Sequence, residues 1–215
     1  KFRKFKWYGG SFEARRPDQV EFANNVNSYQ LFSAGGMDFV FLHLECNAPD
    51  EVLEWAGEVL TRHQNRRALI STHMDLGIRI RPTTPEGYVT DPKARMEWIK
   101  VHGARGNTPV QMWQKLYRKH ANLGFIFSGD QSRVTAMRIS EPGDHGNVVH
   151  ALLSDYMSVG PLRLYRFLPQ QNKVQVITYD TTRRELVNRM IYVPDPSQHQ
   201  FILDYPMVST APSAR

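Results

Sequence analysis

The sequence predicts an α/β fold over residues 1–205, on the strength of three patterns. Apolar runs of strand length recur, amphipathic helical stretches separate them through the middle of the chain, and the last third holds short strand-like segments alone. Strands that alternate with helices indicate a largely parallel sheet with helices on its faces. The chain has 215 residues, of which 41% are hydrophobic and 22% charged, so composition and length favour one sizeable globular domain.

The first strand–helix–strand unit is predicted between residues 37 and 72. Met37–Leu44 is a short apolar run with strand character. Asp50 is expected to cap the helix that follows, because its carboxylate can accept from the free amide groups and complements the helix dipole. The next buried strand is Ala68–Thr72. The helix between them shows apolar residues at helical spacing, which are Val52, Leu53, Ala56, Val59 and Leu60.

A second helix is predicted to start at Thr108, with Pro109 in its first turn and Gln111 completing a capping box. The strand Gly124–Phe127 follows it. Before this helix lie some 34 residues rich in proline, glycine and arginine. Segments of that length without periodicity are uncommon in compact domains, so we expect a lid or substrate-binding loop, with a decorative insertion as the alternative.

The last third is predicted to be an antiparallel meander, because turn-forming residues separate its short strands. The tail at residues 206–215 is small and polar and is expected to fray. The predicted strands are Arg133–Ile139, Val148–Leu153, Leu162–Phe167 and Lys173–Tyr179.

Polar side chains follow three of the predicted parallel strands, at Glu45, His73 and Asp130. Ligands of open α/β sheets collect beyond the carboxyl ends of the strands, so His73 and Asp130 are expected to converge on a cation or an anionic group. The alternative for His73 is that it caps a turn. Asp130 follows a glycine, and a plain turn aspartate is the local alternative there.

Several segments occur in a recognisable order. Ser71-Thr72-His73 ends one buried strand, a helix with Trp113 follows, and Asn122–Asp130 reads Asn-Leu-Gly-Phe-Ile-Phe-Ser-Gly-Asp. In this order the chain resembles the C-terminal half of the calcineurin-like metallophosphoesterases, from about Tyr8 to Tyr179. The resemblance implies part of a layered α-β-β-α sandwich with mixed sheets, and a hydrolase that uses two divalent metals to cleave a phosphoester.

The resemblance also implies site residues. His73 matches a metal-binding histidine of the family, while Gly129-Asp130-Gln131-Ser132 stands where the family has Gly-His-x-His. His73 and Asp130 are thus implied as ligands of Mn, Fe, Zn or Mg, and the oxygen of Asp130 suits Mn or Mg better than Zn. The substrate-binding candidates are Gln131, Ser132, Arg133, Arg79 and Arg105. His102 is a weaker catalytic candidate at the leaving group, with an exposed loop histidine as its alternative.

The family's N-terminal motifs (Asp-x-His, Gly-Asp-x-x-Asp and Gly-Asn-His) do not precede His73. We therefore expect the missing ligands on an N-terminal segment outside this chain or on another protein chain. Two functions follow: a metal-dependent phosphoester hydrolase with an incomplete or altered metal site, or a non-catalytic binding or structural protein on a decayed phosphoesterase fold.

Charge and apolar content limit the partners. The net charge is +6 and the isoelectric point about 9.5, which favours anionic ligands. Basic and aromatic residues interleave only at Lys1–Lys6, where a solvated edge is favoured over a nucleic-acid contact. The longest apolar runs are too short for a membrane-spanning helix. A single cysteine, Cys46, excludes an internal disulfide and a cysteine-rich zinc module.

Overall fold

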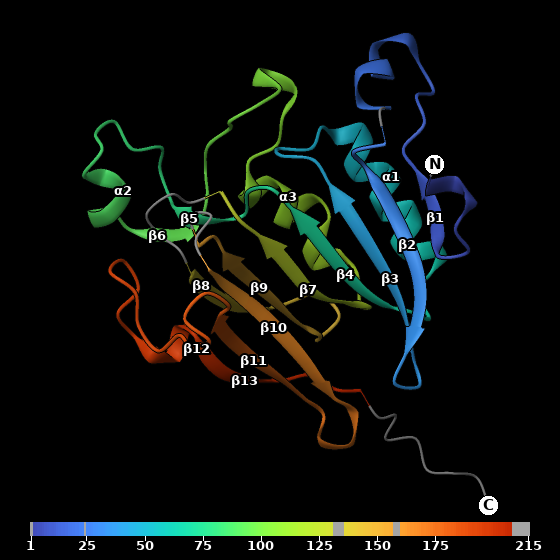
Figure 1. Cartoon of the computed structure of the whole chain (residues 1–215). Coiled ribbons are helices and arrows are strands. Elements are labelled where there is room, and N and C mark those ends of the chain that lie inside the picture. Colours follow the sequence, from blue (N-terminus) through green and yellow to red (C-terminus); the bar gives the residue numbers. More distant parts are fainter. Residues whose placement is uncertain (1, 24, 131–135, 157–159, 208–215) are drawn as a thin grey trace, which may run out of the picture. The chain divides into compact units, whose positions relative to one another are not determined.

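The computed structural model describes residues 2–23, 25–130, 136–156 and 160–207 (Figure 1). By its internal contacts the chain divides into two compact units, Lys1–Asp155 and Tyr156–Arg215. The two units are described separately below. The prediction of one domain over residues 1–205 stays a prediction.

The first unit is built on a seven-stranded sheet with the order β1-β2-β3-β4-β7-β9-β8. Strands β3, β4, β7 and β9 are mutually parallel, and the outer strands are antiparallel to their neighbours. The carboxyl ends of the four parallel strands therefore share one edge of the sheet. The bounds are β1 (Tyr8–Ser11), β2 (Ser28–Ala34), β3 (Met37–Leu44), β4 (Arg67–Thr72), β7 (Leu123–Ser128), β8 (Ala136–Pro142) and β9 (Val148–Ser154).

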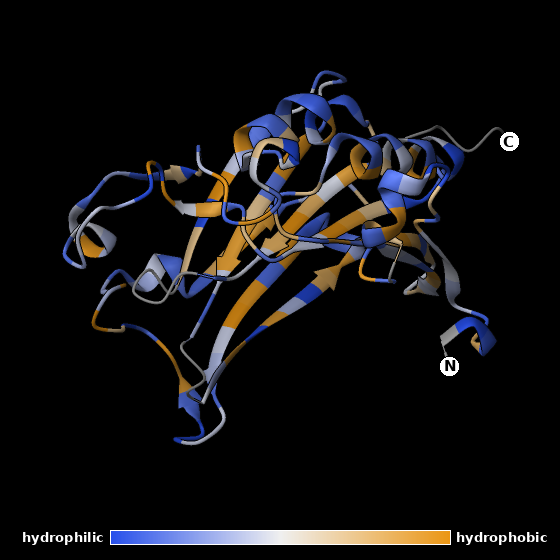
Figure 2. Cartoon of the chain, turned by 90° about the horizontal axis from the view of Figure 1, so that it is seen from above, coloured by the Kyte–Doolittle hydropathy of each residue, from blue (hydrophilic) through white to orange (hydrophobic). Residues whose placement is uncertain are grey.

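Helices α1 (Asp50–Arg62) and α3 (Pro109–Lys115) lie against one face of this sheet (Figure 1). Alternate residues of each strand point to that face, where they meet the apolar stripes of the helices. Figure 2 shows the hydrophilic side of the helices turned away from the strands. Each fully buried aliphatic side chain contributes roughly 1.5–3 kcal/mol. The core includes Val40, Leu42, Val52, Ala56, Leu60, Ile70, Met112, Leu116, Ile126 and Ala151.

Local sequence signals explain how these helices start. The capping box at Thr108 is confirmed, because the Thr108 hydroxyl accepts from the Gln111 amide at 3.1 Å and the Gln111 side chain accepts from the Thr108 amide at 2.8 Å. The predicted cap of α1 is wrong: Pro49 is the N-cap and makes no side-chain cap bond. Asp50 is the first helical residue, and its carboxylate accepts from Lys115 Nζ at 2.6 Å instead.

The long segment between β4 and α3 is ordered by short elements of its own. Strands β5 (Leu76–Ile78) and β6 (Lys93–Arg95) form an antiparallel pair, with the single turn α2 (Gly87–Thr90) between them. The 3₁₀ turn Gly103–Arg105 precedes α3. Further 3₁₀ turns occur at Phe2–Lys4, Pro17–Phe22, Tyr117–Lys119, Pro169–Gln171 and Pro196–Gln198.

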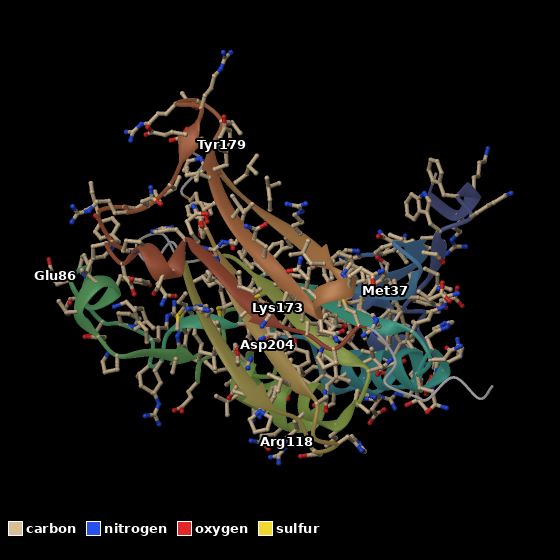
Figure 3. All side chains as sticks on the ribbon, turned by 90° about the horizontal axis from the view of Figure 1, so that it is seen from below. Met37, Glu86, Arg118, Lys173, Tyr179 and Asp204 are labelled. Carbon is tan, nitrogen blue, oxygen red and sulfur yellow. The ribbon has the colours of Figure 1, made fainter. Side chains whose placement is uncertain are left out.

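The second unit holds a four-stranded antiparallel sheet in which β11 pairs with β10, β12 and β13. Along β11, Val174, Val176 and Thr178 are buried, and the residues between them are half-buried. Lys173 on β11 and Asp204 on β13 form an ion pair of 2.5 Å across the sheet (Figure 3). The bounds are β10 (Pro161–Leu168), β11 (Lys173–Asp180), β12 (Glu185–Leu186) and β13 (Gln200–Asp204).

The predicted layered α-β-β-α sandwich is wrong. Strands make up 39% and helices 22% of the chain, with one large mixed sheet of seven strands and few helices. Among the residues that the structure describes, the expected alternation of strands and helices occurs only around α1 and α3. The predicted meander is also wrong in part, because Val148–Ser154 pairs in parallel with β7 and extends the first sheet. The pairs β8–β9 and β10–β11 are antiparallel as expected.

Candidate functional site

Glu45, His73 and Asp130 lie at the same edge of the large sheet because each follows a parallel strand. Glu45 comes directly after β3, His73 directly after β4, and Asp130 two residues after β7. Backbone and hydroxyl contacts tie these ends together. The Thr72 hydroxyl donates to the Glu45 carbonyl at 3.2 Å, and the Gly129 amide donates to the His73 carbonyl at 3.1 Å. We call Glu45, His73, Lys100, His102 and Asp130 the strand-end cluster.

The structure brings His73 and Asp130 together. Nε2 of the imidazole lies 3.3 Å from Oδ2 of the carboxylate. Asp130 has a left-handed backbone with φ of 60°. The His73 side chain is 55% exposed and that of Asp130 22% exposed, so a ligand can reach both.

Lys100 is a member of the cluster that sequence reasoning missed. Its Nζ lies 2.5 Å from Oδ2 of Asp130, the same oxygen that faces His73. Lys100 belongs to the long segment between β5–β6 and α3. No periodicity or motif in that segment marks it, so the sequence carried no signal for this contact.

Asn47 fixes the backbone that carries Lys100. Its amide is fully buried and its backbone is left-handed, with φ of 51°. Oδ1 accepts from the amides of Lys100 at 2.8 Å and Val101 at 3.4 Å, and Nδ2 donates to the Asn107 carbonyl at 2.8 Å. A buried amide with both ends satisfied holds a loop in one conformation. The polar residues after β3 marked the region of Asn47 in the sequence, but the sequence did not show which backbone groups its side chain binds.

His102 pairs with Glu45 in the same cluster. Its Nε2 lies 3.0 Å from Oε2 of Glu45, and Oε1 of that carboxylate accepts from Asn27 Nδ2 at 2.6 Å. The ring packs edge-on against Phe22, with centroids 5.3 Å apart. A carboxylate that binds one ring nitrogen holds an imidazole in one orientation. His102 is therefore not the freely exposed loop histidine that was the alternative.

Cys46 follows Glu45 in the chain, and its half-buried thiol is unreactive at neutral pH. Burial raises the pKa of its thiol to about 11, the negative charges of Asp130 and Glu45 add to the rise, and Lys100 opposes it. The thiolate is the reactive form of cysteine, so this side chain is not a nucleophile at neutral pH.

The arginines expected to bind substrate pair with carboxylates instead. Arg105 contacts Glu21 and Glu51, each at 3.1 Å, and stacks over the Phe22 ring at 4.7 Å. Arg79 pairs with Glu97 at 2.8 Å. Both guanidinium groups therefore already contact carboxylates, and anion binding by Arg79 and Arg105 stays a prediction. The other three substrate-binding candidates, Gln131, Ser132 and Arg133, lie outside the described residues.

A buried charge cluster anchors the segment that carries Lys100 and His102. The Arg95 guanidinium, 6% exposed, pairs with Asp75, 1% exposed, and with Glu141 on β8. It also lies 4.8 Å from the centre of the Trp113 ring. Burial raises the pKa of the Asp75 carboxyl, and Arg95 opposes that rise. A charge network this deeply buried fixes geometry, because separating its members leaves an uncompensated buried charge.

The described residues do not complete a metal centre. Across residues 2–23, 25–130, 136–156 and 160–207, no three His, Cys, Asp or Glu side chains are grouped so as to hold a metal ion. His73 and Asp130 provide two suitable donors, and two metals need more.

None of the helices in the same ranges has the length and apolar character that a membrane crossing requires.

Comparisons with known proteins give one relative and no family. No family model matches the chain. It is similar to a Bacillus subtilis (strain 168) protein named "Uncharacterized protein YvnB", with 26% identity over 190 residues. The match covers 83% of this chain and 12% of that protein, so the chain corresponds to a small part of its relative's length.

Proposed function

We propose that the chain is a relative of the metal-dependent phosphoester hydrolases with an altered metal site. The observation that carries this proposal is the 3.3 Å approach of His73 and Asp130 at the carboxyl edge of parallel strands. Ligands of such sheets bind at that edge. The resemblance of the segments around His73 and Asp130 to that superfamily supports the same function.

The chemistry of the cluster fits parts of this reaction. An imidazole nitrogen and a carboxylate oxygen are donors that Mn, Fe, Zn and Mg accept, and a bound divalent metal would supply Lewis-acid activation of water and phosphoester. His102, whose ring contacts Glu45 at 3.0 Å, would be the candidate to exchange a proton with a leaving oxygen. The remaining metal donors would come from an N-terminal segment or another protein chain.

The donor set also disagrees with an unaltered two-metal site. Only two donors converge among the described residues, and the ammonium of Lys100 contacts the carboxylate oxygen that a metal would use. This observation favours a second candidate function, in which the cluster binds a phosphoester or another anion without hydrolysing it.

Hydrolysis of p-nitrophenyl phosphate separates the two functions. We would assay the complete gene product that contains these residues with Mn, Fe, Zn and Mg in turn. Loss of a metal ligand should reduce turnover by about a hundredfold or more, so His73→Ala and Asp130→Asn should be nearly inactive. His145→Ala is the matched control, because this exposed histidine contacts the Lys119 carbonyl in another turn. Absence of turnover with every metal would overturn the hydrolase and leave the non-catalytic binding protein.

A further inference from the structure

We propose that the ammonium group of Lys100 is a built-in counter-ion that takes the place of a divalent metal beside Asp130. This inference rests on the proposed function, because it concerns how the same strand-end cluster is regulated. Metal binding at Asp130 would then be a competition in which the metal displaces the side chain of Lys100.

The argument begins with one oxygen atom. Oδ2 of Asp130 lies 2.5 Å from Nζ of Lys100 and 3.3 Å from Nε2 of His73. His73 and Asp130 would hold a metal through Nε2 and a carboxylate oxygen, and Oδ2 is the carboxylate oxygen that faces Nε2. The ammonium already neutralises the carboxylate there and provides the hydrogen-bond donors that an anionic oxygen requires.

The position of Lys100 is fixed by its surroundings. Its own amide is bound by the buried Asn47 side chain at 2.8 Å, directly beyond the end of β3. The Asp130 backbone is held by the bond from the Gly129 amide to the His73 carbonyl at 3.1 Å. Both ends of the ion pair are therefore carried by backbones that are tied to neighbouring strand ends, and little ordering is needed to form it.

The positive charge of Lys100 makes it a competitor of a divalent ion at Asp130. A divalent ion entering beside Asp130 meets the positive charge of Lys100 at short range, and that repulsion opposes binding unless the lysine swings away. The Lys100 side chain is 41% exposed, so it can move into water when a metal enters. The cluster is thus expected to bind metal weakly as it stands and more tightly once the ammonium is removed.

The test compares Mn²⁺ affinity by isothermal titration calorimetry in Lys100→Met and in the unchanged protein. We expect Lys100→Met to bind Mn²⁺ about tenfold more tightly, because the variant lacks the competing charge but keeps the aliphatic stem. Lys115→Met is the matched control. Lys115 is 42% exposed and pairs with Asp50 at 2.6 Å, so its loss removes the same charge from an equivalent surface pair.

Equal Mn²⁺ affinity in Lys100→Met and Lys115→Met would overturn the proposal. Because binding is measured without turnover, this result is separate from a failure to hydrolyse p-nitrophenyl phosphate. If the circular dichroism signal shows that Lys100→Met does not fold, the competition can be tested in the unchanged protein by measuring how far acetic anhydride acetylates Lys100. Added Mn²⁺ should increase labelling of Lys100 and leave Lys115 constant, and no increase at Lys100 would refute the competition.

Discussion

Replacing Arg95 with methionine removes the central charge of the buried cluster that anchors the segment between β4 and α3. Arg95 is 6% exposed and pairs with Asp75, which is 1% exposed. Glu141 is 32% exposed and can be hydrated when its partner is lost. The main cost therefore comes from Asp75, whose carboxylate is left buried without a counter-ion. Removing one partner of a buried ion pair costs about 3–5 kcal/mol of stability. Arg95→Met also loses the stacking of the guanidinium on Trp113, so we expect a loss of unfolding free energy in the upper half of that range.

The loss of stability in Arg95→Met should be larger at higher pH. Burial raises the pKa of Asp75 in the unchanged protein, and Arg95 opposes the rise. Without Arg95 the folded-state pKa rises further above the unfolded value of about 3.9. Because the pKa of Asp75 is higher in the folded variant than in its unfolded chain, the folded state binds the proton more tightly. Arg95→Met is therefore most stable below the pKa that Asp75 has in the unfolded chain, and it loses stability as pH increases through the pKa that Asp75 has in the folded state. The deficit of Arg95→Met should therefore be larger at pH 7 than at pH 4.

Urea unfolding followed by tryptophan fluorescence measures this deficit. All four tryptophans (Trp7, Trp55, Trp98 and Trp113) lie in the first unit, so the signal reports that unit alone. Adding Asp75→Asn to Arg95→Met should recover about 2 kcal/mol, because the second change removes the unpaired charge. A deficit below about 1 kcal/mol at pH 7, or an equal deficit at both pH values, would refute the reasoning.

Three further outcomes are expected. Asn47→Ala should lower the unfolding free energy of the first unit, measured in urea, by about 2–3 kcal/mol, since the half-buried backbone amides of Lys100 and Val101 lose their acceptor. Cys46 should react with iodoacetamide at half its maximal rate near pH 11, the pKa of its thiol, and a midpoint below pH 9 would contradict its assigned burial. Gly160→Ala should speed hydrogen exchange of β11 by at least about fivefold, because a Cβ there would lie 2.4 Å from Asp180 Oδ1.

Matched variants serve as controls for the measurements on Asn47→Ala and Gly160→Ala. Asn122→Ala and Asn147→Ala are unsuitable comparisons for Asn47 because both amides also bind backbone carbonyls. Ser33→Ala on the exposed end of β2 should change stability by less than about 0.5 kcal/mol. Gly36→Ala has open space for its Cβ and tests the effect of a left-handed φ of 76° without a clash. If Ser33→Ala costs as much as Asn47→Ala, the assigned role of the buried amide is contradicted.

Local patterns in the sequence were enough to find the elements that build the strand-end cluster. The apolar run at Met37–Leu44, the helical spacing after Asp50 and the capping box at Thr108 each depend on neighbours within one or two turns. The observed bounds of β3, α1, β7 and α3 follow these signals closely. Parallel pairing of β4 with β7 then brings His73 and Asp130 to one edge, as the alternation of strands and helices predicted.

The overall architecture and two of the five members of the strand-end cluster depend on contacts that local patterns do not encode. The pairing of β9 with β7 is parallel although a hairpin joins β8 to β9, and periodicity alone does not distinguish these arrangements. Lys100 and His102 reach the cluster because buried polar groups, chiefly Asn47 and Arg95, fold an aperiodic segment back onto the sheet. Arg79 and Arg105 looked available for anions because their carboxylate partners lie far away in the sequence or in irregular segments.

Paramagnetic broadening of backbone amide signals by Mn²⁺ addresses the pairing of His73 with Asp130 most directly. Nuclear magnetic resonance spectra of the nitrogen-15-labelled chain should show the signals of residues 73 and 130 fading together as Mn²⁺ is added, and ahead of those around the surface carboxylate of Asp50. In His73→Ala, broadening at residue 130 should need a higher Mn²⁺ concentration. Fading at only one of the two positions, or an unchanged response of residue 130 in that variant, would show that the two side chains do not act on one cation.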